Sequence, residues 1–151
     1  MTGRVGAADP EAARRNASLY RRWFEEVVNG RDAAGADELL APDYVAHFPG
    51  VAGGLDRTGH LALLQAFWAG FPDWTETVED VLVEGDRVVI RVTGRGRHAG
   101  SFQGIPPTGT AVTATGIGIA RILDGRIVET WAEYDALGLL RQLGAVPSRP
   151  A

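Results

Sequence analysis

The hydrophobic period of this chain changes once, and that change limits the folds open to it. Before Pro72, apolar side chains recur every three or four residues, which is the spacing of amphipathic helices. After Trp74, segments rich in Val, Ile and Thr are separated by short turns, which is typical of strands. Helices followed by hairpin-linked strands predict an α+β domain in which the helices cover one face of a sheet.

Helix-start and helix-stop signals divide the first half. Asp9 and Pro10 suit the cap and first turn of a helix that ends at Asn29-Gly30. Pro42 ends a second, short helix, and a third helix lies before the turn at Phe71-Pro72. The expected helices therefore cover residues 9–29, 33–40 and 58–71, with an extended piece at 44–48.

Turn residues mark the strands of the second half. Glu84-Gly85-Asp86-Arg87 and Leu123-Asp124-Gly125-Arg126 are hairpin signals. Long strands joined in this way twist and curl, so a cavity is expected on the hollow side, beneath the helices. The expected strands cover residues 75–84, 87–98, 111–123 and 126–134, followed by a short helix at 136–143. We predict one domain over residues 9–144, with tails at 1–8 and 145–151.

Composition excludes several classes of function. The chain has 151 residues, a net charge of −4 and no basic stripe, which argues against nucleic-acid binding. It has no cysteine, and its three histidines lack metal-ligand spacing. No apolar run is long enough to span a membrane, and the first ten residues show no signal peptide. A cytoplasmic protein with a small-molecule partner is expected, without nucleic acid or membrane as partner.

Four short motifs carry a family resemblance. They occur in order as EGDRVV (84–89), GIPPTG (104–109), DGRI (124–127) and QLG (142–144). Together they resemble the SnoaL-like polyketide cyclases, also called ester cyclases, of the nuclear-transport-factor-2-like superfamily, over about residues 20–144. The resemblance implies a cone-shaped fold, with three N-terminal helices packed on a strongly curved antiparallel sheet. It also implies ring closure by intramolecular aldol chemistry without metal or cofactor.

The last hairpin is where the resemblance places the reacting groups. If Leu123-Asp124-Gly125 forms a three-residue loop, Ile122 pairs with Arg126, and two sets of side chains alternate between the faces. The set assigned to the cavity is Gly116, Gly118, Thr130 and Ala132, and the set on the other face is Ile117, Ile119, Glu129, Trp131 and Glu133. The reversed assignment, with Glu129, Trp131 and Glu133 toward the cavity, stays open.

The resemblance implies an acid/base carboxylate at Ala132 and polar groups, including histidine, at Gly116, Gly118 and Thr130. Enolate formation needs a base within about 3 Å of the proton to be removed. Alanine and glycine supply none, so a catalytic group is expected elsewhere on the cavity wall. Small residues at these positions widen the pocket instead.

We predict His47 and Asp135 as the proton-handling pair. His47 ends the extended piece beside a loop that could line the pocket, and histidine suits proton transfer near neutral pH. Asp135 is the carboxylate nearest to position 132, where the resemblance implies an acid and this chain has alanine. Asp135 also suits a helix N-cap. His98 suits a loop-anchoring role beside the pocket, and His60 is expected to be exposed at the start of the third helix.

Aromatic side chains are expected to complete the cavity wall from the helices. Such a wall suits an apolar metabolite of the planar polycyclic or terpenoid kind. The predicted substrate-binding residues are Tyr20, Trp23, Phe67, Trp68, Trp74, His98, Phe102, Gly116, Gly118, Thr130, Ala132 and Tyr134.

The favoured function is a cofactor-independent enzyme of the cyclase, isomerase or lyase type that acts on an apolar metabolite. One alternative is a non-catalytic binding or accessory protein that keeps the cone and has lost the chemistry. A second is an epoxide hydrolase-like enzyme, which requires a carboxylate aimed at a trapped water. The apolar residues Ile117, Ile119, Ile127 and Trp131, assigned to the outer sheet face, predict a homodimer through that face.

Overall fold

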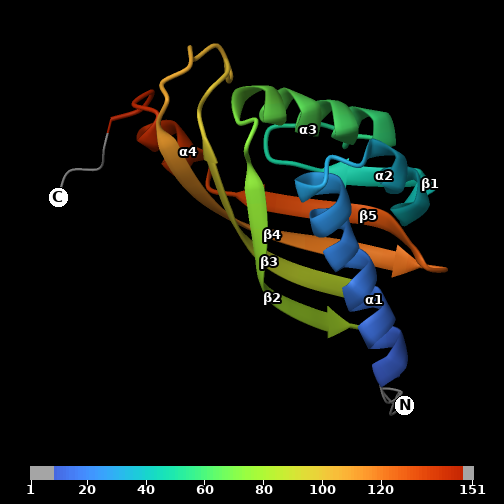
Figure 1. Cartoon of the computed structure of the whole chain (residues 1–151). Helices are drawn as coiled ribbons and strands as arrows, with labels where there is room; N and C mark the ends of the chain where they lie inside the picture. The colour runs from blue at the N-terminus through green and yellow to red at the C-terminus, as the bar shows by residue number, and fades with distance from the viewer. Residues whose placement is uncertain (1–8, 148–151) are drawn as a thin grey trace.

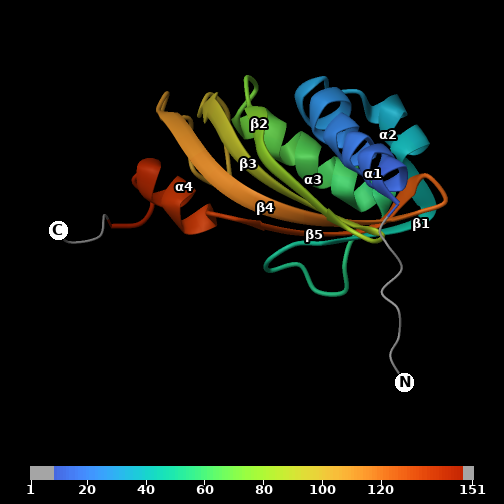
Figure 2. The same ribbon diagram turned by 90° about the horizontal axis from the view of Figure 1, so that it is seen from below.

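The computed structural model describes residues 9–147, so the predicted tail at 1–8 and residues 148–151 of the other tail lie outside the described residues. One five-stranded sheet, in the order β1-β5-β4-β3-β2, curves around three helices on its concave side (Figures 1 and 2). The fourth helix lies at one end of the sheet, next to the chain's C-terminal end (Figure 2). The predicted α+β cone is confirmed.

The helices follow the sequence signals closely. Asp9 accepts a hydrogen bond from the Glu11 amide at 3.0 Å and caps the first helix, as its position predicts. No helix of residues 9–147 has both the length and the apolar character needed to cross a membrane. The helices are α1 (Pro10–Arg22), the π-helix η1 (Trp23–Asn29), α2 (Ala33–Leu39), α3 (Arg57–Gly70) and α4 (Ala136–Gln142).

The π-helix η1 is the main departure in this half, because the sequence predicted one continuous α-helix. Its wider turn buries Trp23, Phe24, Val27 and Val28 together, four of the seven residues in the segment. Asn29, its last residue, then lies against the start of the sheet, where it contacts Glu76. Wide helical turns of this kind are frequent at functional sites.

The strands are β1 (Leu40–His47), β2 (Thr75–Glu84), β3 (Arg87–Arg97), β4 (Ala111–Leu123) and β5 (Arg126–Tyr134). β2, β4 and β5 have the predicted bounds. β1 begins four residues earlier than the predicted extended piece and pairs in parallel with β5 at the sheet edge. The edge position tolerates Pro42, which has no amide hydrogen to donate.

The predicted register of the last hairpin was wrong. The loop has two residues, Asp124 and Gly125, with φ of 50° and 72°, and Leu123 pairs with Arg126. Gly118 therefore pairs with Ala132 rather than Thr130, and Gly116 pairs with Tyr134 rather than Ala132. Because the shift is two residues, the side chains keep their predicted faces beyond the irregularity near the turn.

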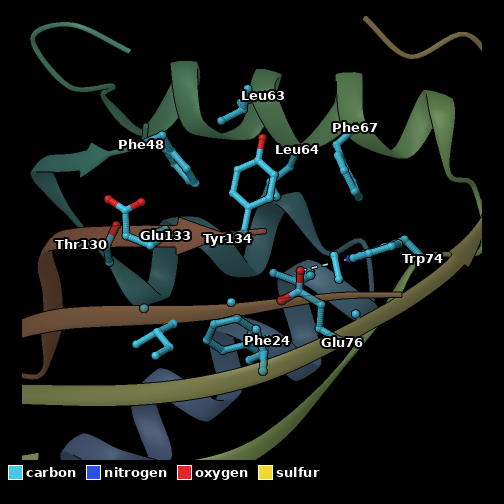
Figure 3. A pocket seen from close by; sticks show the side chains of 18 of the residues that line it. Phe24, Phe48, Leu63, Leu64, Phe67, Trp74, Glu76, Thr130, Glu133 and Tyr134 are labelled. Carbon is cyan, nitrogen blue, oxygen red and sulfur yellow. Dashed lines mark hydrogen bonds between the residues drawn. The ribbon is translucent and has the colours of Figure 1, made fainter. Parts of the chain in front are cut away.

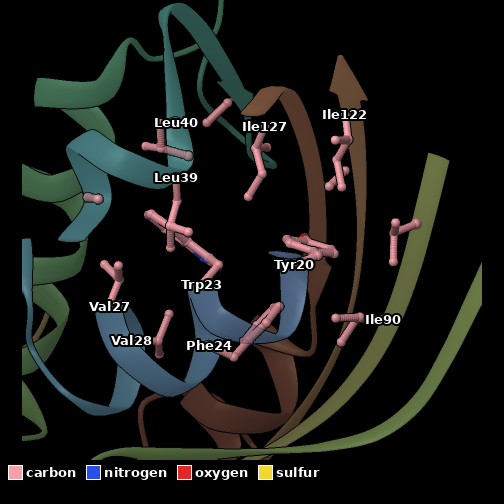
Figure 4. Packing of buried hydrophobic residues seen from close by; sticks show 14 of the residues in the cluster. Tyr20, Trp23, Phe24, Val27, Val28, Leu39, Leu40, Ile90, Ile122 and Ile127 are labelled. Atoms are coloured by element: carbon pink, nitrogen blue, oxygen red, sulfur yellow. The ribbon is translucent and has the colours of Figure 1, made fainter. Parts of the chain in front are cut away.

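A bulge in β5 also overturns the assignment of Ile127 to the outer face. The pairing passes from Arg121–Glu129 to Ile122–Ile127, so Val128 is an extra residue. The extra residue turns Ile127 inward, where it is fully buried. Figure 4 shows it among the apolar side chains that α1, η1 and α2 pack against the sheet.

Candidate functional site

A cavity of about 300 Å³ lies between the helices and the concave face of the sheet. Its size matches the lower end of small-molecule sites, and most of its walls are apolar. Figure 3 shows side chains from α3 and from the sheet converging on it. Its polar wall residues include His60, Glu76, Thr130 and Glu133.

The structure brings all but two of the predicted substrate-binding residues to this cavity. Gly116, Gly118, Thr130 and Ala132 line it from the sheet, and Glu129 and Trp131 do not, so the reversed face assignment is wrong for these two. Glu133, near the end of β5, lines the cavity as the reversed assignment had it. The other predicted residues that line it are Tyr20, Trp23, Phe67, Trp74, Phe102 and Tyr134.

Trp68 and His98 do not line the cavity. Trp68 lies under the Arg31 guanidinium, 4.4 Å from its ring centre. The His98 side chain is fully buried and accepts a hydrogen bond from the Thr108 amide, at 3.2 Å, so its loop-anchoring role is confirmed. Helical spacing and strand position do not reveal these details, because both residues turn toward partners brought in by loops.

Neither His47 nor Asp135 reaches the cavity, so the predicted proton-handling pair is wrong. His47 lies on the convex face, where it stacks on Trp131 and its Nε2 lies 2.8 Å from a Glu129 oxygen. The parallel pairing of β1 with β5 places it there. Asp135 is exposed and accepts a hydrogen bond from the Gly138 amide at 2.8 Å, which is the N-cap role that its sequence position also suited.

A chain of three hydrogen-bonded side chains lies in the cavity wall. The Tyr44 hydroxyl is 2.9 Å from Nδ1 of His60 and 2.5 Å from the Thr130 hydroxyl. All three residues are at most 6% exposed. The chain links β1, α3 and β5, and its two ends, His60 and Thr130, line the cavity.

Burial sets the protonation states of this chain. It lowers the pKa of His60 to about 4, because the charged imidazolium is poorly solvated there. It also raises the pKa of Tyr44 above its ordinary value. At neutral pH both groups are therefore uncharged, and the single Tyr44 hydroxyl proton can be donated either to His60 or to Thr130.

Two proton arrangements satisfy the chain. Thr130 can donate to Tyr44 and Tyr44 to Nδ1 of His60, which leaves the imidazole proton on Nε2. In the reverse order, Nδ1 donates to Tyr44 and Nε2 carries a lone pair. The hydrogen bonds of residues 9–147 engage the His60 ring only through Nδ1, so Nε2 is free to donate to or accept from a bound molecule.

His60 was expected to be exposed, and that expectation was wrong. Its ring is 4% exposed and packs between the rings of Trp23, Tyr44 and Phe48, with centroids 4.9 to 5.9 Å away. The helix start does put it near a loop. However, that loop folds back onto the sheet, since Ala46 pairs with Leu55 and draws α3 down over the cavity.

Glu76 is the second polar group that sequence analysis missed. It lies at the start of β2, and its Oε1 accepts a hydrogen bond from the Trp74 indole at 3.0 Å (Figure 3). The Asn29 side chain fixes the Glu76 backbone with two hydrogen bonds of 2.8 Å. Its Oδ1 accepts from the Glu76 amide, and its Nδ2 donates to the Glu76 carbonyl. Burial raises the pKa of the Glu76 carboxyl, although Trp74 and Arg31 oppose that shift.

Small residues on the sheet let the helices approach closely. A Cβ at Gly118 would lie 2.4 Å from the Tyr20 hydroxyl, and a Cβ at Gly94 would lie 2.0 Å from the Trp74 ring. Both distances are too short for any side chain. Tyr20 and Trp74 therefore occupy space that the glycines leave, and burial raises the pKa of Tyr20, so its hydroxyl stays protonated.

No three acidic or histidine side chains gather at one point within residues 9–147 to form a metal-ligand cluster. The cavity instead combines a buried neutral histidine with hydroxyl groups, carboxyl groups and aromatic walls. The hydroxyl groups belong to Tyr20, Thr115, Thr130 and Tyr134, and the carboxyl groups to Glu76 and Glu133. This set can orient and polarise an apolar molecule that carries carbonyl groups, and it can move a proton.

Comparisons with known proteins agree with this geometry. Residues 18–143 match the family described as SnoaL-like polyketide cyclase. An aklanonic acid methyl ester cyclase from Streptomyces peucetius is 31% identical over 136 residues, covering 83% of this chain and 88% of the relative. A nogalonic acid methyl ester cyclase from Streptomyces nogalater is 34% identical over 113 residues, covering 72% and 82%.

The crystal structure of IdmH from Streptomyces antibioticus is also similar. It superposes with a TM-score of 0.78 at 39% sequence identity, covering 85% of this chain and 98% of that chain. The family match spans every element from the second half of α1 to the end of α4, and therefore the whole cavity.

Proposed function

Because this chain belongs to the SnoaL-like polyketide cyclase family, we propose that it closes a ring in an apolar, carbonyl-bearing small molecule without a cofactor. The enzyme class follows from the relatives, which are cyclases. The substrate class is our inference from the walls of the cavity, which are aromatic and aliphatic with few polar groups.

The observation that carries this proposal is the hydrogen-bonded chain from Thr130 through Tyr44 to His60. In an intramolecular aldol closure, negative charge develops on the oxygen of the carbonyl that becomes an enolate. A neutral imidazole that donates from Nε2 stabilises that oxygen without first giving up a proton. When Thr130 donates to Tyr44 and Tyr44 donates to Nδ1, His60 carries its proton on Nε2, which is the tautomer that this role requires.

Position 132 does not take part in this scheme as an acid or base. Ala132 pairs with Gly118, and the two line the cavity opposite Tyr20 without any ionisable group of their own. We propose that Ala132 serves to admit the substrate, since its small side chain leaves room on the sheet side of the cavity, whereas the Tyr20 hydroxyl occupies the space beside Gly118. The same proposal includes the substrate contacts predicted from the sequence, which are Tyr20, Trp23, Phe67, Trp74, Phe102, Gly116 and Tyr134.

The test is a turnover assay with aklanonic acid methyl ester and nogalonic acid methyl ester as probes. Ring closure gives a product of unchanged mass that chromatography separates from the substrate. We expect such a product from the wild-type protein. Thr130→Val, which keeps the side-chain shape but removes the hydroxyl, should lower kcat about 10- to 100-fold. Thr77→Val, an exposed threonine on β2, is the matched control and should leave kcat unchanged.

The other outcomes of this assay separate the alternatives. Quenching of tryptophan fluorescence by a probe without any product would favour a non-catalytic binding protein. A product heavier by one water, obtained from an epoxide-bearing probe, would favour a hydrolase. Equal kcat in the Thr130→Val and wild-type proteins would remove the hydrogen-bonded chain from the mechanism.

A further inference from the structure

A ring closure of this kind needs a base as well as an oxyanion donor, and the cavity offers few candidates. Among the residues that the structure describes, two carboxylates line it, Glu76 and Glu133. Glu133 is exposed, whereas Glu76 is partly buried between apolar walls that include Phe24 and Val28. His60 stays neutral to about pH 4 and is therefore a weak base.

We propose that Glu76 is the proton-carrying catalytic residue of this enzyme, from β2 rather than from the last hairpin. The inference rests on the proposed function, since it assigns the base for that reaction. Three hydrogen bonds hold Glu76 in place. Two join its backbone to the Asn29 side chain, and the third joins its Oε1 to the Trp74 indole. Among the described residues, the Glu76 carboxyl is hydrogen-bonded only through Oε1, which leaves Oε2 for the substrate.

The local construction is specific to this carboxylate. Glu76 pairs with Gly94, whose lack of a Cβ lets the Trp74 ring lie flat over β3 and bring its indole nitrogen to Glu76. The π-helix η1 ends at Asn29, which supplies the two backbone contacts. An ordinary surface glutamate on a strand needs none of these partners.

The proposed step balances without another reactant. The Glu76 carboxylate removes a proton from a carbon next to a carbonyl, and the electron pair of that C–H bond passes into the enolate. The enolate carbon then forms the new C–C bond to a second carbonyl carbon, whose π electrons become an alkoxide. Glu76 returns the proton to the alkoxide, so the product is an isomer of the substrate.

Burial supports this role by making Glu76 a stronger base than an exposed glutamate. The other ionisable groups around it are Tyr20 on α1, Arg31 after η1, and His60, Glu133 and Tyr134 across the cavity. Tyr20 and Tyr134 remain protonated, since burial raises the pKa of both hydroxyls. Activity should therefore rise with pH through the raised pKa of Glu76.

The experiment measures proton removal apart from ring closure. Benzoylacetone carries an acidic methylene between two carbonyl groups, and its exchange in deuterium oxide is followed by NMR. We expect wild-type protein to accelerate the exchange and Glu76→Gln to lose that acceleration about 100-fold or more. Glutamine keeps an oxygen for the Trp74 indole, so the fold should persist. Glu79→Gln, at an exposed bulge of the same strand, is the matched control.

Several results would overturn the assignment of Glu76. In the first, Glu76→Gln accelerates the exchange of benzoylacetone as much as the wild-type protein does. In the second, Glu133→Gln loses the acceleration instead. In the third, the wild-type protein does not accelerate the exchange at all. Failure of the proposed function would look different, because it would leave the exchange intact while no ring closes in the turnover assay. A rise in KM with unchanged kcat in Glu76→Gln would also count against a role in the chemical step.

Discussion

His60 shows at the residue scale how the fold turns an ordinary side chain into a functional one. Its place at the start of a helix suggests exposure, and sequence spacing gives no hint of its partners. In the structure, three aromatic rings and the Tyr44 hydroxyl enclose it. Those neighbours come from η1, β1 and the loop after β1, so only tertiary contacts could reveal the site.

The depressed pKa of His60 predicts a specific dependence of stability on pH. The unfolded chain binds a proton near pH 6.5, whereas the folded chain does so only near pH 4. The contribution of the neutral His60 side chain to the free energy of unfolding is therefore fully present above pH 6.5 and is lost as the pH falls toward 4. Over that range, the free energy of unfolding of the wild-type protein should fall by about 3 kcal/mol more than that of His60→Gln, as measured by urea unfolding.

A parallel titration of His47→Gln serves as the control, because His47 is partly exposed on the convex face. The free energies of unfolding of wild type and His60→Gln could instead differ by the same amount at every pH between 7 and 4. That result would show that the imidazole becomes charged inside the fold.

Residue patterns predicted the cavity face of the sheet better than they predicted its chemistry. Gly116, Gly118, Thr130 and Ala132 line the cavity as strand alternation requires, even though the register was off by two. Alternation survives such a shift, because side chains return to the same face every second residue. Glu76 was missed because the sequence of β2 does not distinguish it from the other acidic residues of that strand, Glu79, Asp80 and Glu84.

Most elements were predictable because their boundaries carry their own signals. Turn glycines delimit β2, β4 and β5, and Asp9 and Asp135 cap helices as expected. The π-helix η1 carries no such signal, since its apolar spacing also fits an α-helix. It forms where packing against the sheet favours burial of four neighbouring apolar side chains.

The contact between η1 and β2 gives an element-scale prediction. Asn29→Ala removes both hydrogen bonds to the Glu76 backbone and leaves a strand end without partners. The free energy of unfolding should fall by about 1 to 3 kcal/mol. Amide hydrogen exchange at Glu76 should become faster, because its amide loses the Asn29 acceptor. Asn29→Asp keeps that acceptor and should protect the amide, while Asn16→Ala, which removes a hydrogen bond of 3.5 Å to the Gly85 carbonyl beyond the other end of β2, is the control.

An unchanged exchange rate in Asn29→Ala would mean that Glu76 is held by its strand neighbours alone.

At the scale of the whole molecule, the convex face of the sheet remains partly apolar. Leu82 and Ile117 are 67% and 51% exposed, and Trp131 lies between His47 and Arg87 on the same face. Ile127 does not contribute, contrary to the sequence assignment, because it is buried in the core. The homodimer through this face stays a prediction.

Sedimentation velocity at micromolar concentration tests that prediction. We expect a dimer for the wild-type protein and a monomer for Ile117→Lys, which places a charge in the middle of the apolar face. Leu137→Lys, an exposed leucine on α4, is the matched control and should remain dimeric. A wild-type monomer would contradict the prediction.

The proposed enzyme is a cavity that closes rings with a carboxylate on β2. The most direct test is the single-turnover rate of ring closure in wild type, Glu76→Gln and Glu79→Gln, with saturating enzyme and circular dichroism to verify the fold. We expect a rate about 100-fold lower or more in Glu76→Gln and an unchanged rate in Glu79→Gln. Equal rates in all three proteins would contradict it.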